Sequence, residues 1–488
     1  MSQFSEKLKY LIEESGTNIY QLAKNAGLDR TTIQRSITGE RLPGTAFVEK
    51  LCDFLRVSPR ERKDLMELYS INKIGEKTYA GRKYIKELIE QIATLHINGS
   101  SNLNIEKSFT IKNDITQNIK VFSGQYNVNN IIRDIMEEEA FNENNPKISL
   151  TVPFDYNYLF DCLHQLYWES NGQIEIQHIV RFSKNPHSQQ NSNINLENLS
   201  HVLPFAFCIR NGYQPYYYYG TENMAKDISL TMPYYLFTSK RLVTLSSDFK
   251  TAILYNNDDI KSVYYDNFQK CLTQAKPFVN QLADCGDMLT TYFKAYKIAG
   301  QVTNVIEPQP CFGKYYTHEM VDKHLLPEVQ HWEEVRQDLY KFYDSYNSSN
   351  VPSKCFFSIE GLKYMVNTGV MADLPPRFAS PFTLQERKYL LKSLRDDIKK
   401  EDLIFCATDS SKFIISPFLT LQVHKGSGIV FIAADNNGIV SCTINEQSIC
   451  DAFRDFFESL PESDLFYSKE ETISVLDGFI EQLENMKD

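Results

Sequence analysis

Apolar residues recur every three or four positions through the first seventy residues, and short polar stretches interrupt this pattern. Such spacing predicts a set of short amphipathic helices. Gly16, Gly27 and Gly39 are expected to end the first three, because glycine adopts the left-handed backbone of a helix end most readily. The predicted helices run from a Ser5 cap to Gly16, from Ile19 to Ala26, from Arg30 to about Thr38, from Ala46 to Leu55 (Phe47, Leu51 and Phe54 inward), and from Ser58-Pro59 onward.

The second and third predicted helices have the residue types that a helix-turn-helix unit needs. Ala23 is small enough for the third helix to cross close to the second. Gly27 occupies the turn, where a left-handed backbone is required, and Leu28 supplies an apolar turn residue. Ile33 is a β-branched core residue of the third helix. These positions favour one structure independently, and a helical bundle that never touches DNA is the alternative.

The segment from Thr17 to Pro43, TNIYQLAKNAGLDRTTIQRSITGERLP, resembles the Cro/C1-type (XRE) family of repressor domains. The resemblance extends over about residues 5–69. It implies that the third helix enters the major groove of DNA with its first turns facing base edges. By position it implies base-reading roles for Arg30, Thr31, Gln34 and Arg35, and phosphate-contacting roles for Thr17, Asn18, Gln21, Thr32 and Arg41.

Two further points follow from this resemblance. One head has a small footprint on DNA, so a homodimer on an inverted repeat is expected. For Gln21 and Gln34, a plain solvated helix face is the alternative to a contact with DNA.

Residues 71–146 are expected to form a connector that could also carry dimer contacts. Their pattern predicts a long polar helix, a β-hairpin and a second helix. These elements are expected at Lys73 to Leu95 (Tyr84, Leu88, Ile89 and Ile92 on one side), at Lys107 to Gln125, and from an Asn127 cap to about Ala140.

From Lys147 onward, alternating and helical patterns are mixed, which is typical of an α/β body. Strands are expected at Ile148 to Val152 and Gln173 to Phe182, a helix at Asn157 to Glu169, and a surface loop at Lys184 to Asn198.

Two stretches of this body match each other, residues 242–268 and residues 429–457. Each predicts a β-hairpin followed by an amphipathic helix that ends in an aromatic residue. Upstream, the apolar run at Ile148 has a rough counterpart in the run at Cys355. We therefore expect an internal duplication, with halves at residues 147–305 and 306–488 and a ligand cleft between them. Chance likeness of hairpin-plus-helix units is the alternative.

The expected fold class is therefore multidomain, with an all-α helix-turn-helix head at residues 1–70, a helical and β-hairpin connector, and a large duplicated α/β body. The body weakly resembles the duplicated phospholipase D-like fold. The chemistry of that fold needs two H-x-K…D motifs, and the sequence contains none. The resemblance therefore implies a catalytically inactive version.

No motif points to catalysis in the body. The sequence contains neither the G-x-x-x-x-G-K-[ST] phosphate loop nor the G-x-S-x-G nucleophile elbow. His318, His324 and His331 are six and seven positions apart, whereas a helical metal site needs ligands three or four apart. We therefore expect no metal, no cofactor and no enzymatic activity.

Tyrosines crowd the region between Tyr213 and Tyr235. Ordinary packing is one interpretation, and a wall that binds a ligand or another subunit is the other. On the second interpretation, the candidate ligand residues are Arg210, Tyr217, Tyr219 and Lys240.

The net charge of −11 over 488 residues argues at first against a nucleic-acid partner. Along the chain, however, the first hundred residues carry +3 and residues 101–488 carry −14. The 10 cysteines are scattered without a C-x-x-C pair, which favours reduced thiols. Apolar runs are far shorter than the roughly 20 residues of a membrane span, and no secretory signal is visible. These features favour the cytoplasm and no membrane partner.

The sequence therefore predicts a DNA-binding transcription regulator, with repression favoured over activation, whose body senses a small molecule or a partner protein. Two alternatives stay open: a protein-interaction switch of the lysogeny or immunity type, and an enzyme with a DNA-targeting head. A catalytic set in the body would favour the enzyme, and a single protein partner without a small-molecule response would favour the switch.

Overall fold

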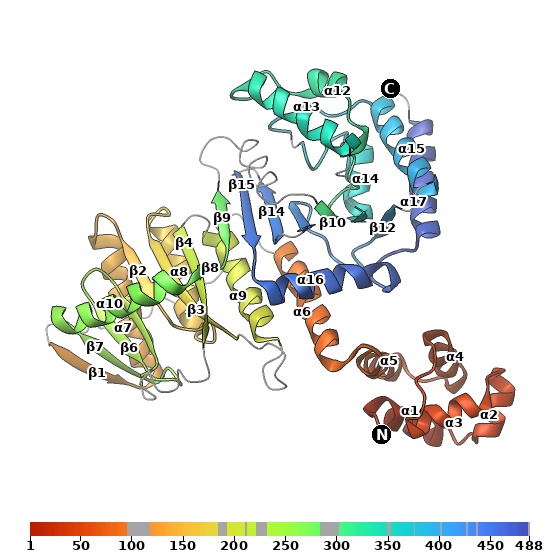
Figure 1. Cartoon of the computed structure of the whole chain (residues 1–488), viewed down its shortest axis with the longest axis horizontal. Helices are drawn as coiled ribbons and strands as arrows, with labels where there is room; N and C mark the ends of the chain where they lie inside the picture. Colours follow the sequence, from red (N-terminus) through yellow and green to blue (C-terminus); the bar gives the residue numbers. More distant parts are fainter. Residues whose placement is uncertain are drawn as a thin grey trace. The chain divides into compact units, whose positions relative to one another are not determined.

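A computed structural model describes residues 1–94, 118–183, 193–209, 212–220, 232–283, 302–348, 353–374, 376–400, 403–425, 428–435 and 438–486. The chain divides into two compact units, Met1–Lys83 and Tyr84–Asp488, which we call the head and the body (Figure 1). Within the described residues, no helix combines the length and the apolar character needed to cross a membrane.

The head consists of short helices around one apolar core. The predicted second and third helices are confirmed residue by residue. The first helix begins earlier than predicted, because the side chain of Ser2, not Ser5, caps it by accepting a hydrogen bond from the Ser5 amide. The helices are α1 (Gln3–Glu14), α2 (Ile19–Ala26), α3 (Arg30–Thr38), α4 (Thr45–Leu55) and α5 (Pro59–Ile74).

The inward position predicted for Phe54 is wrong, since this side chain is 36% exposed. Val48, Leu51 and Cys52 form the buried stripe of α4 at positions i, i+3 and i+4. Phe54 lies two residues after Cys52 and therefore points away from that stripe.

The long helix predicted from Lys73 to Leu95 is interrupted. Gly75, with φ +87°, separates α5 from α6 (Glu76–Thr94). The boundary between head and body falls inside α6. Its second part is buried in the core of the body, where Ile85, rather than the predicted Tyr84, completes the apolar stripe. The buried residues of α6 are Ile85, Leu88, Ile89 and Ile92, each at most 2% exposed.

The first sheet of the body has the strand order β1-β7-β6-β5-β2-β3-β4-β8 among the described residues. Strands β2, β3 and β4 are parallel, and the other neighbours pair in antiparallel fashion. The strands are β1 (Ile119–Ser123), β2 (Lys147–Leu150), β3 (Glu175–Ser183), β4 (Tyr213–Gly220), β5 (Tyr234–Phe237), β6 (Leu242–Leu245), β7 (Thr251–Tyr255) and β8 (Lys276–Pro277).

The second sheet has the order β12-β11-β10-β13-β14-β15-β9, again among the described residues. Here β10, β11 and β12 are parallel and the other neighbours antiparallel. The strands are β9 (Asn280–Ala283), β10 (Val302–Glu307), β11 (Lys354–Ser358), β12 (Ile404–Thr408), β13 (Leu419–His424), β14 (Ile429–Asp435) and β15 (Gly438–Ile444).

The two sheets follow the same plan. In each, three parallel strands are followed along the chain by three antiparallel strands. A strand from earlier in the chain, β1 or β9, then pairs with the last of these, β7 or β15. The run β1-β7-β6-β5-β2-β3-β4 thus corresponds, position by position, to β9-β15-β14-β13-β10-β11-β12. Such agreement in order and direction is the arrangement that an internal duplication produces.

The two matched sequence stretches occupy equivalent places in this plan. The first forms the hairpin β6–β7 and helix α10, and the second forms the hairpin β14–β15 and helix α16. The upstream match, however, is wrong by one strand. Ile148 lies on β2, the counterpart of β10, whereas Cys355 lies on β11, the counterpart of β3. Short buried strands are uniformly apolar, so their sequences alone do not distinguish them.

Several predicted boundaries also differ from the structure. Strand β1 pairs with β7, and α7 packs into the same core, so residues from 118 onward belong to the first sheet layer rather than to a connector ending at 146. Strand β9 begins the second layer ahead of residue 306. Helix α7 begins after Gly124, not after an Asn127 cap. Part of the predicted loop Lys184 to Asn198 is helical, because α9 begins at Ile194. Residues 107–117 of the predicted hairpin lie outside the described residues.

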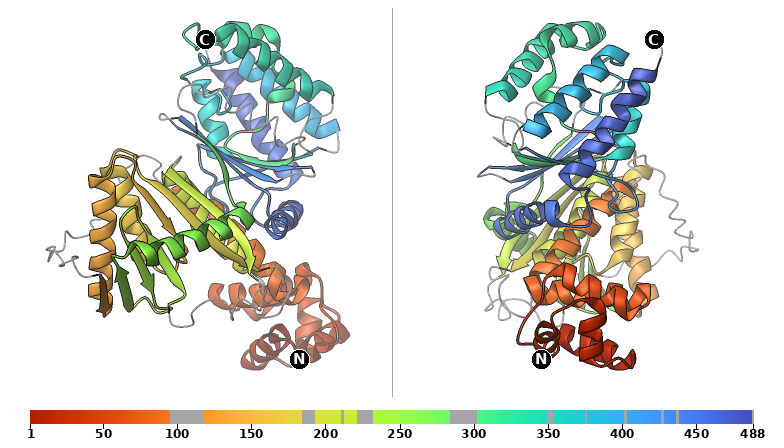
Figure 2. Two further views of the ribbon diagram at one scale, coloured as in Figure 1. Left: turned by 60° about the vertical axis from the view of Figure 1, so that its left-hand side comes forward. Right: turned by 90° about the vertical axis from the view of Figure 1, so that its right-hand side faces the viewer.

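Helices cover both faces of the second sheet because its side chains alternate. Cys355 and Phe357 pack with the core of α14, α15 and α17, whereas Phe356 between them packs with α16 (Figures 1 and 2). The body helices are α7 (Gln125–Asn142), α8 (Asn157–Glu169), α9 (Ile194–Ile209), α10 (Asp258–Gln274), α12 (His318–His324), α13 (Trp332–Ser348), α14 (Ile359–Thr368), α15 (Leu384–Lys400), α16 (Gln447–Ser459) and α17 (Lys469–Asn485).

Candidate nucleic-acid interface

The turn between α2 and α3 holds the third helix in a fixed position. Gly27 has φ +60° and ends α2 in the left-handed region, as predicted. Asp29 then caps α3, because its Oδ2 accepts hydrogen bonds from the Thr32 amide at 2.7 Å and from the Thr32 hydroxyl at 2.6 Å. These bonds hold the pKa of the Asp29 carboxyl below its ordinary value. The ionised carboxylate also stabilises the helix by lying at the positive end of its dipole.

One face of α3 is buried and the opposite face is exposed. Ile33 and Ile37 pack into the core of the head, and Ser36 between them is also buried. The exposed face carries a stripe of four side chains, Thr31, Gln34, Arg35 and Thr38, at positions i, i+3, i+4 and i+7. Together with Arg30 and Glu40 they line a hollow of about 400 Å³.

The structure thus brings together the four residues predicted to read bases. The guanidinium groups of Arg30 and Arg35 form no hydrogen bond or ion pair with any other described residue. Their donors are therefore available to an external acceptor. A guanidinium can bind the O6 and N7 atoms of guanine through two parallel hydrogen bonds, which is the commonest specific contact in the major groove.

A second hollow, of about 590 Å³, continues the surface from α3 to the beginning of α2. Thr17 and Asn18, predicted to contact phosphate, line it together with Arg30. The Asn18 side chain caps α2 by accepting the Gln21 amide at 2.8 Å. Helix N-termini attract phosphate because their amides and dipole are positive, so this surface suits a DNA backbone flanking the groove.

Thr32 and Arg41, also predicted to contact phosphate, lie next to each other beside the first turn of α3. Thr32 is buried, and its hydroxyl donates its hydrogen to Asp29, so this hydroxyl has no second hydrogen to donate to a phosphate. Arg41 is exposed, and its Nη1 lies 3.5 Å from the Thr32 hydroxyl oxygen, beside the first turn of α3. Its remaining donors can still face a phosphate.

The two hollows also include exposed residues that were not predicted from the sequence to contact DNA. Thr38 and Glu40 line the hollow along α3, and Tyr20, 61% exposed, lines the second hollow. The signal for Thr38 was present, because it continues the helical spacing of Thr31 and Gln34. Glu40 lies beyond the end of the helix, where helical spacing gives no information.

Two of the candidate ligand residues contact each other and a third lies elsewhere: the rings of Tyr217 and Tyr219 on β4 have centroids 5.6 Å apart, whereas Lys240 does not join them. Tyr217 is 5% exposed and packs against Phe182 and Phe278, which is the ordinary-packing interpretation. The Tyr219 hydroxyl donates to Glu446 at 2.7 Å. Lys240 follows β5 and pairs with Glu143 at 2.6 Å. Two strands separate β4 from β5, about 14 Å at ordinary strand spacing. Arg210 lies outside the described residues, and the ligand role of this set stays a prediction.

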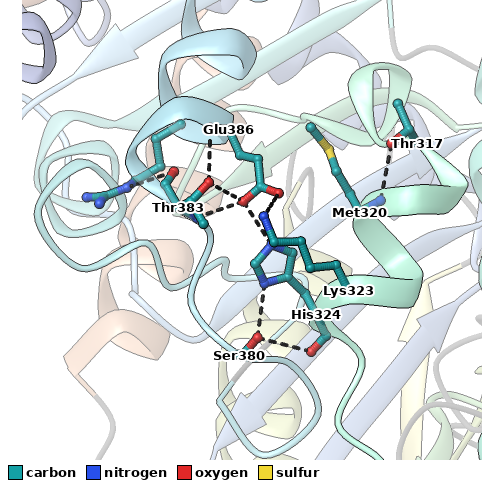
Figure 3. Close-up of polar contacts among 8 residues, drawn as sticks. Thr317, Met320, Lys323, His324, Ser380, Thr383 and Glu386 are labelled. Atoms are coloured by element: carbon teal, nitrogen blue, oxygen red, sulfur yellow. Dashed lines mark hydrogen bonds and ion pairs between the residues drawn. The ribbon is translucent and has the colours of Figure 1, made fainter. Parts of the chain in front are cut away.

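The histidines considered as metal ligands have other partners. His318 contacts Asp344 at 3.0 Å and stacks on Tyr340. His324, at the end of α12, is buried and bridges Ser380 and Glu386, with its Nδ1 3.0 Å from the serine Oγ and its Nε2 2.8 Å from Glu386 (Figure 3). No group of three or more potential metal ligands occurs among the described residues.

Glu386 connects the beginning of α15 to the end of α12. Its carboxylate accepts hydrogen bonds from the Thr383 amide and hydroxyl, and its other oxygen pairs with Lys323 at 2.8 Å (Figure 3). Burial alone would raise the pKa of Glu386, but the bonds from Lys323, Thr383 and His324 outweigh it and lower this pKa from 4.5 to about 2. These bonds connect the end of α12 to the beginning of α15 and are expected to stabilise the packing of the two helices, and we call them the Glu386 lock.

Replacing Glu386 with glutamine is expected to lower the free energy of unfolding of the body by about 2–3 kcal/mol at pH 7. A carboxyl whose pKa is lowered on folding stabilises the protein above its unfolded pKa of 4.5, and this contribution disappears as the pH falls toward 2. The wild type should therefore lose stability over this range more steeply than E386Q.

Urea unfolding followed by tryptophan fluorescence measures the stability of the body, because Trp168 and Trp332, the two tryptophans of the chain, both lie in it. E328Q, at an exposed glutamate, is the control, and equal pH slopes for wild type and E386Q would contradict the lock.

Comparison with known proteins bears on the head. A family model described as a helix-turn-helix domain matches residues 3–65. No curated protein matches the sequence. Among solved structures, TrmBL2, described as an archaeal chromatin protein with a novel mode of DNA binding, shares 11% identity at a TM-score of 0.22 and covers 56% of this chain and 100% of its own. A polyphosphate kinase from Porphyromonas gingivalis also shares 11% identity at a TM-score of 0.22, over 78% of this chain and 59% of its own. Similarities this low say nothing about the fold of the body. The chain therefore carries a helix-turn-helix head of the DNA-binding kind, followed by a larger α/β body with mixed sheets.

Proposed function

We propose that this chain is a sequence-specific transcription regulator of the Cro/C1 type, a repressor, which binds an inverted-repeat operator as a homodimer in the cytoplasm. The body is proposed to sense a small molecule or a partner protein, without catalytic activity and without a cofactor.

The observation that carries the proposal is the exposed stripe of α3. Arg30, Thr31, Gln34 and Arg35 share one hollow, and the helix that presents them is fixed at its beginning by Asp29. Side chains on a rigid helix can match the spacing of base edges in the major groove.

The charge distribution supports the same role. Residues 1–83 contain 15 Lys and Arg against 11 Asp and Glu, a net charge of +4. Residues 84–488 contain 36 against 51, a net charge of −15. DNA repels the body and attracts the head, so only the head is suited to approach the duplex.

The size of the reading surface, by which we mean the exposed side chains of α3 together with Glu40, supports the proposed dimer. Helix α3 has nine residues and is about 14 Å long, enough for one half-site. Helix-turn-helix dimers place two such helices in successive major grooves, about 34 Å apart, which matches an inverted repeat.

The body contains two sheets built on the same plan, and the sensing role is proposed for it. For an effector to regulate DNA binding, it must bind one state of the body more tightly than another. The body is proposed to have two such states, and an effector is expected to change operator affinity by roughly 5- to 150-fold.

Selection of random double-stranded DNA by the full chain tests the proposal. We expect an inverted repeat whose half-sites are one helical turn apart, with two chains bound per operator by light scattering. Affinity should fall steeply with salt, because phosphate contacts release counterions. Selection of a single half-site bound by one chain would contradict the dimer, and recovery of no preferred sequence would contradict the specific regulator.

A further inference from the structure

Glu40 is placed on the reading surface by the end of α3. Gly39, with φ +80°, ends the helix in the left-handed region, and the Glu40 amide donates to the Arg35 carbonyl at 2.9 Å. This bond is characteristic of the Schellman motif, which fixes the residue after the glycine relative to the last helical turn. Glu40 is therefore held beside Arg35 and is not part of a loose loop. Both side chains are exposed and line the same hollow.

The hollow has an uneven set of hydrogen-bonding groups. Arg30 and Arg35 only donate, and Thr31, Gln34 and Thr38 both donate and accept. Glu40 is the single carboxylate among these six residues and the one side chain that only accepts. Its carboxylate forms no hydrogen bond or ion pair with another described residue.

A pure acceptor on this surface has a specific complement in DNA. Cytosine presents the N4 amino group, a donor, in the major groove, whereas guanine presents the acceptors N7 and O6. A carboxylate accepts a hydrogen bond from cytosine and repels the acceptors of guanine and thymine. An adjacent arginine has the opposite preference and binds guanine. A neighbouring Glu and Arg can therefore contact the two bases of one G·C pair.

We propose that Glu40 is a specificity-determining residue that, together with Arg35, selects one G·C pair in each half-site. Arg35 donates to the guanine of this pair, and Glu40 accepts from the N4 amino group of the cytosine. The inference rests on the proposed DNA-binding function and extends it from the helix to the residue that follows it.

Binding profiles of the full-length chain against all single-base variants of its selected operator test the inference. For the wild type, replacing the G·C pair by A·T should reduce affinity by about 10-fold or more. In E40Q this penalty should fall by about threefold or more, because the amide NH2 can donate to the O4 atom of the thymine that replaces cytosine, and the part that remains is the preference of Arg35 for guanine. R35A should lose preference at the same base pair. E49Q, a control at an exposed glutamate on α4, should keep the wild-type profile, and thermal unfolding should show that all variants fold.

The outcomes separate the inference from the proposed function. An unchanged E40Q profile would overturn the inference, as would effects of E40Q and R35A at different base pairs. A uniform gain in affinity for every sequence would also overturn it, because it would assign Glu40 to phosphate repulsion alone. In each of these cases the wild type still selects an operator, so the proposed function stands. A wild type that binds no sequence would overturn the proposed function and this inference together.

Discussion

Replacing Arg30 and Arg35 together with alanine is expected to weaken operator binding about 100-fold or more. Each guanidinium lies on the exposed face of α3 with its donors available, and a bidentate contact to guanine contributes about 1–3 kcal/mol. Both also add positive charge near phosphate, so non-specific binding should weaken too, but by less. Fluorescence anisotropy with the selected operator and a scrambled duplex, at one fixed salt concentration, gives both affinities.

The matched control removes the same charge elsewhere on the head. Arg60 and Lys63 are exposed on α5 and belong to neither hollow on the reading surface. The R60A/K63A variant should retain the discrimination between operator and scrambled duplex. If the two double variants lost equal affinity for both duplexes, binding would depend on net charge, and the assignment of α3 as the reading helix would be wrong.

Replacing Gly361 with alanine is expected to destabilise the body by about 3 kcal/mol or more. In most helix interiors this change is stabilising, because alanine has the higher helix propensity. Here, however, a Cβ on Gly361 would lie 2.0 Å from the carbonyl oxygen of Pro308. That oxygen is held in place by the hydroxyl of Ser358, which also caps α14 through the Gly361 amide. Overpacking against a fixed backbone therefore outweighs the gain in propensity.

Gly478 provides the opposite result in the same protein. It lies in α17, and a Cβ there would meet nothing within 4 Å. G478A is therefore expected to stabilise the body by about 0.5–1 kcal/mol. Urea unfolding followed by the fluorescence of Trp168 and Trp332 compares the two variants in the body alone. Similar stabilities for G361A and G478A would show that the chain ahead of α14 yields, and that the close approach to Pro308 is not a constraint.

The head could be predicted from the sequence because its constraints are local. Gly27 and Gly39 each act on the few residues before them, as left-handed helix ends, so their positions fix where α2 and α3 stop. The same reasoning missed Glu40, since its place on the reading surface depends on how the chain leaves the helix. The failure at Gly75 has a similar cause, because the polar pattern continues on both sides of a single backbone break.

The body was harder to predict because its arrangement depends on distant pairing. The hairpins at residues 242–268 and 429–457 could be matched, since a turn and an amphipathic helix give each one a distinctive pattern. The match of Ile148 with Cys355 failed, because the apolar sequence of a buried strand shows that it is buried but does not show which strands it pairs with. The tyrosines of β4 show the same limit. Tyrosine is a residue type that is common at interfaces, yet Tyr217 packs within the core.

Helix α6 determines where the head can be exchanged between proteins. From Tyr84 onward it belongs to the body, where Ile85 and Ile89 are part of the apolar core. A head transplanted with all of α6 would carry an apolar stripe without its partner surface and would tend to aggregate, and the remaining body would lose part of its core. Gly75, where α5 has ended and α6 has not begun, is the junction that preserves both sides. Recombination in evolution, or gene fusion in the laboratory, should therefore give functional chimaeras when the crossover falls there and insoluble ones when it falls near residue 90.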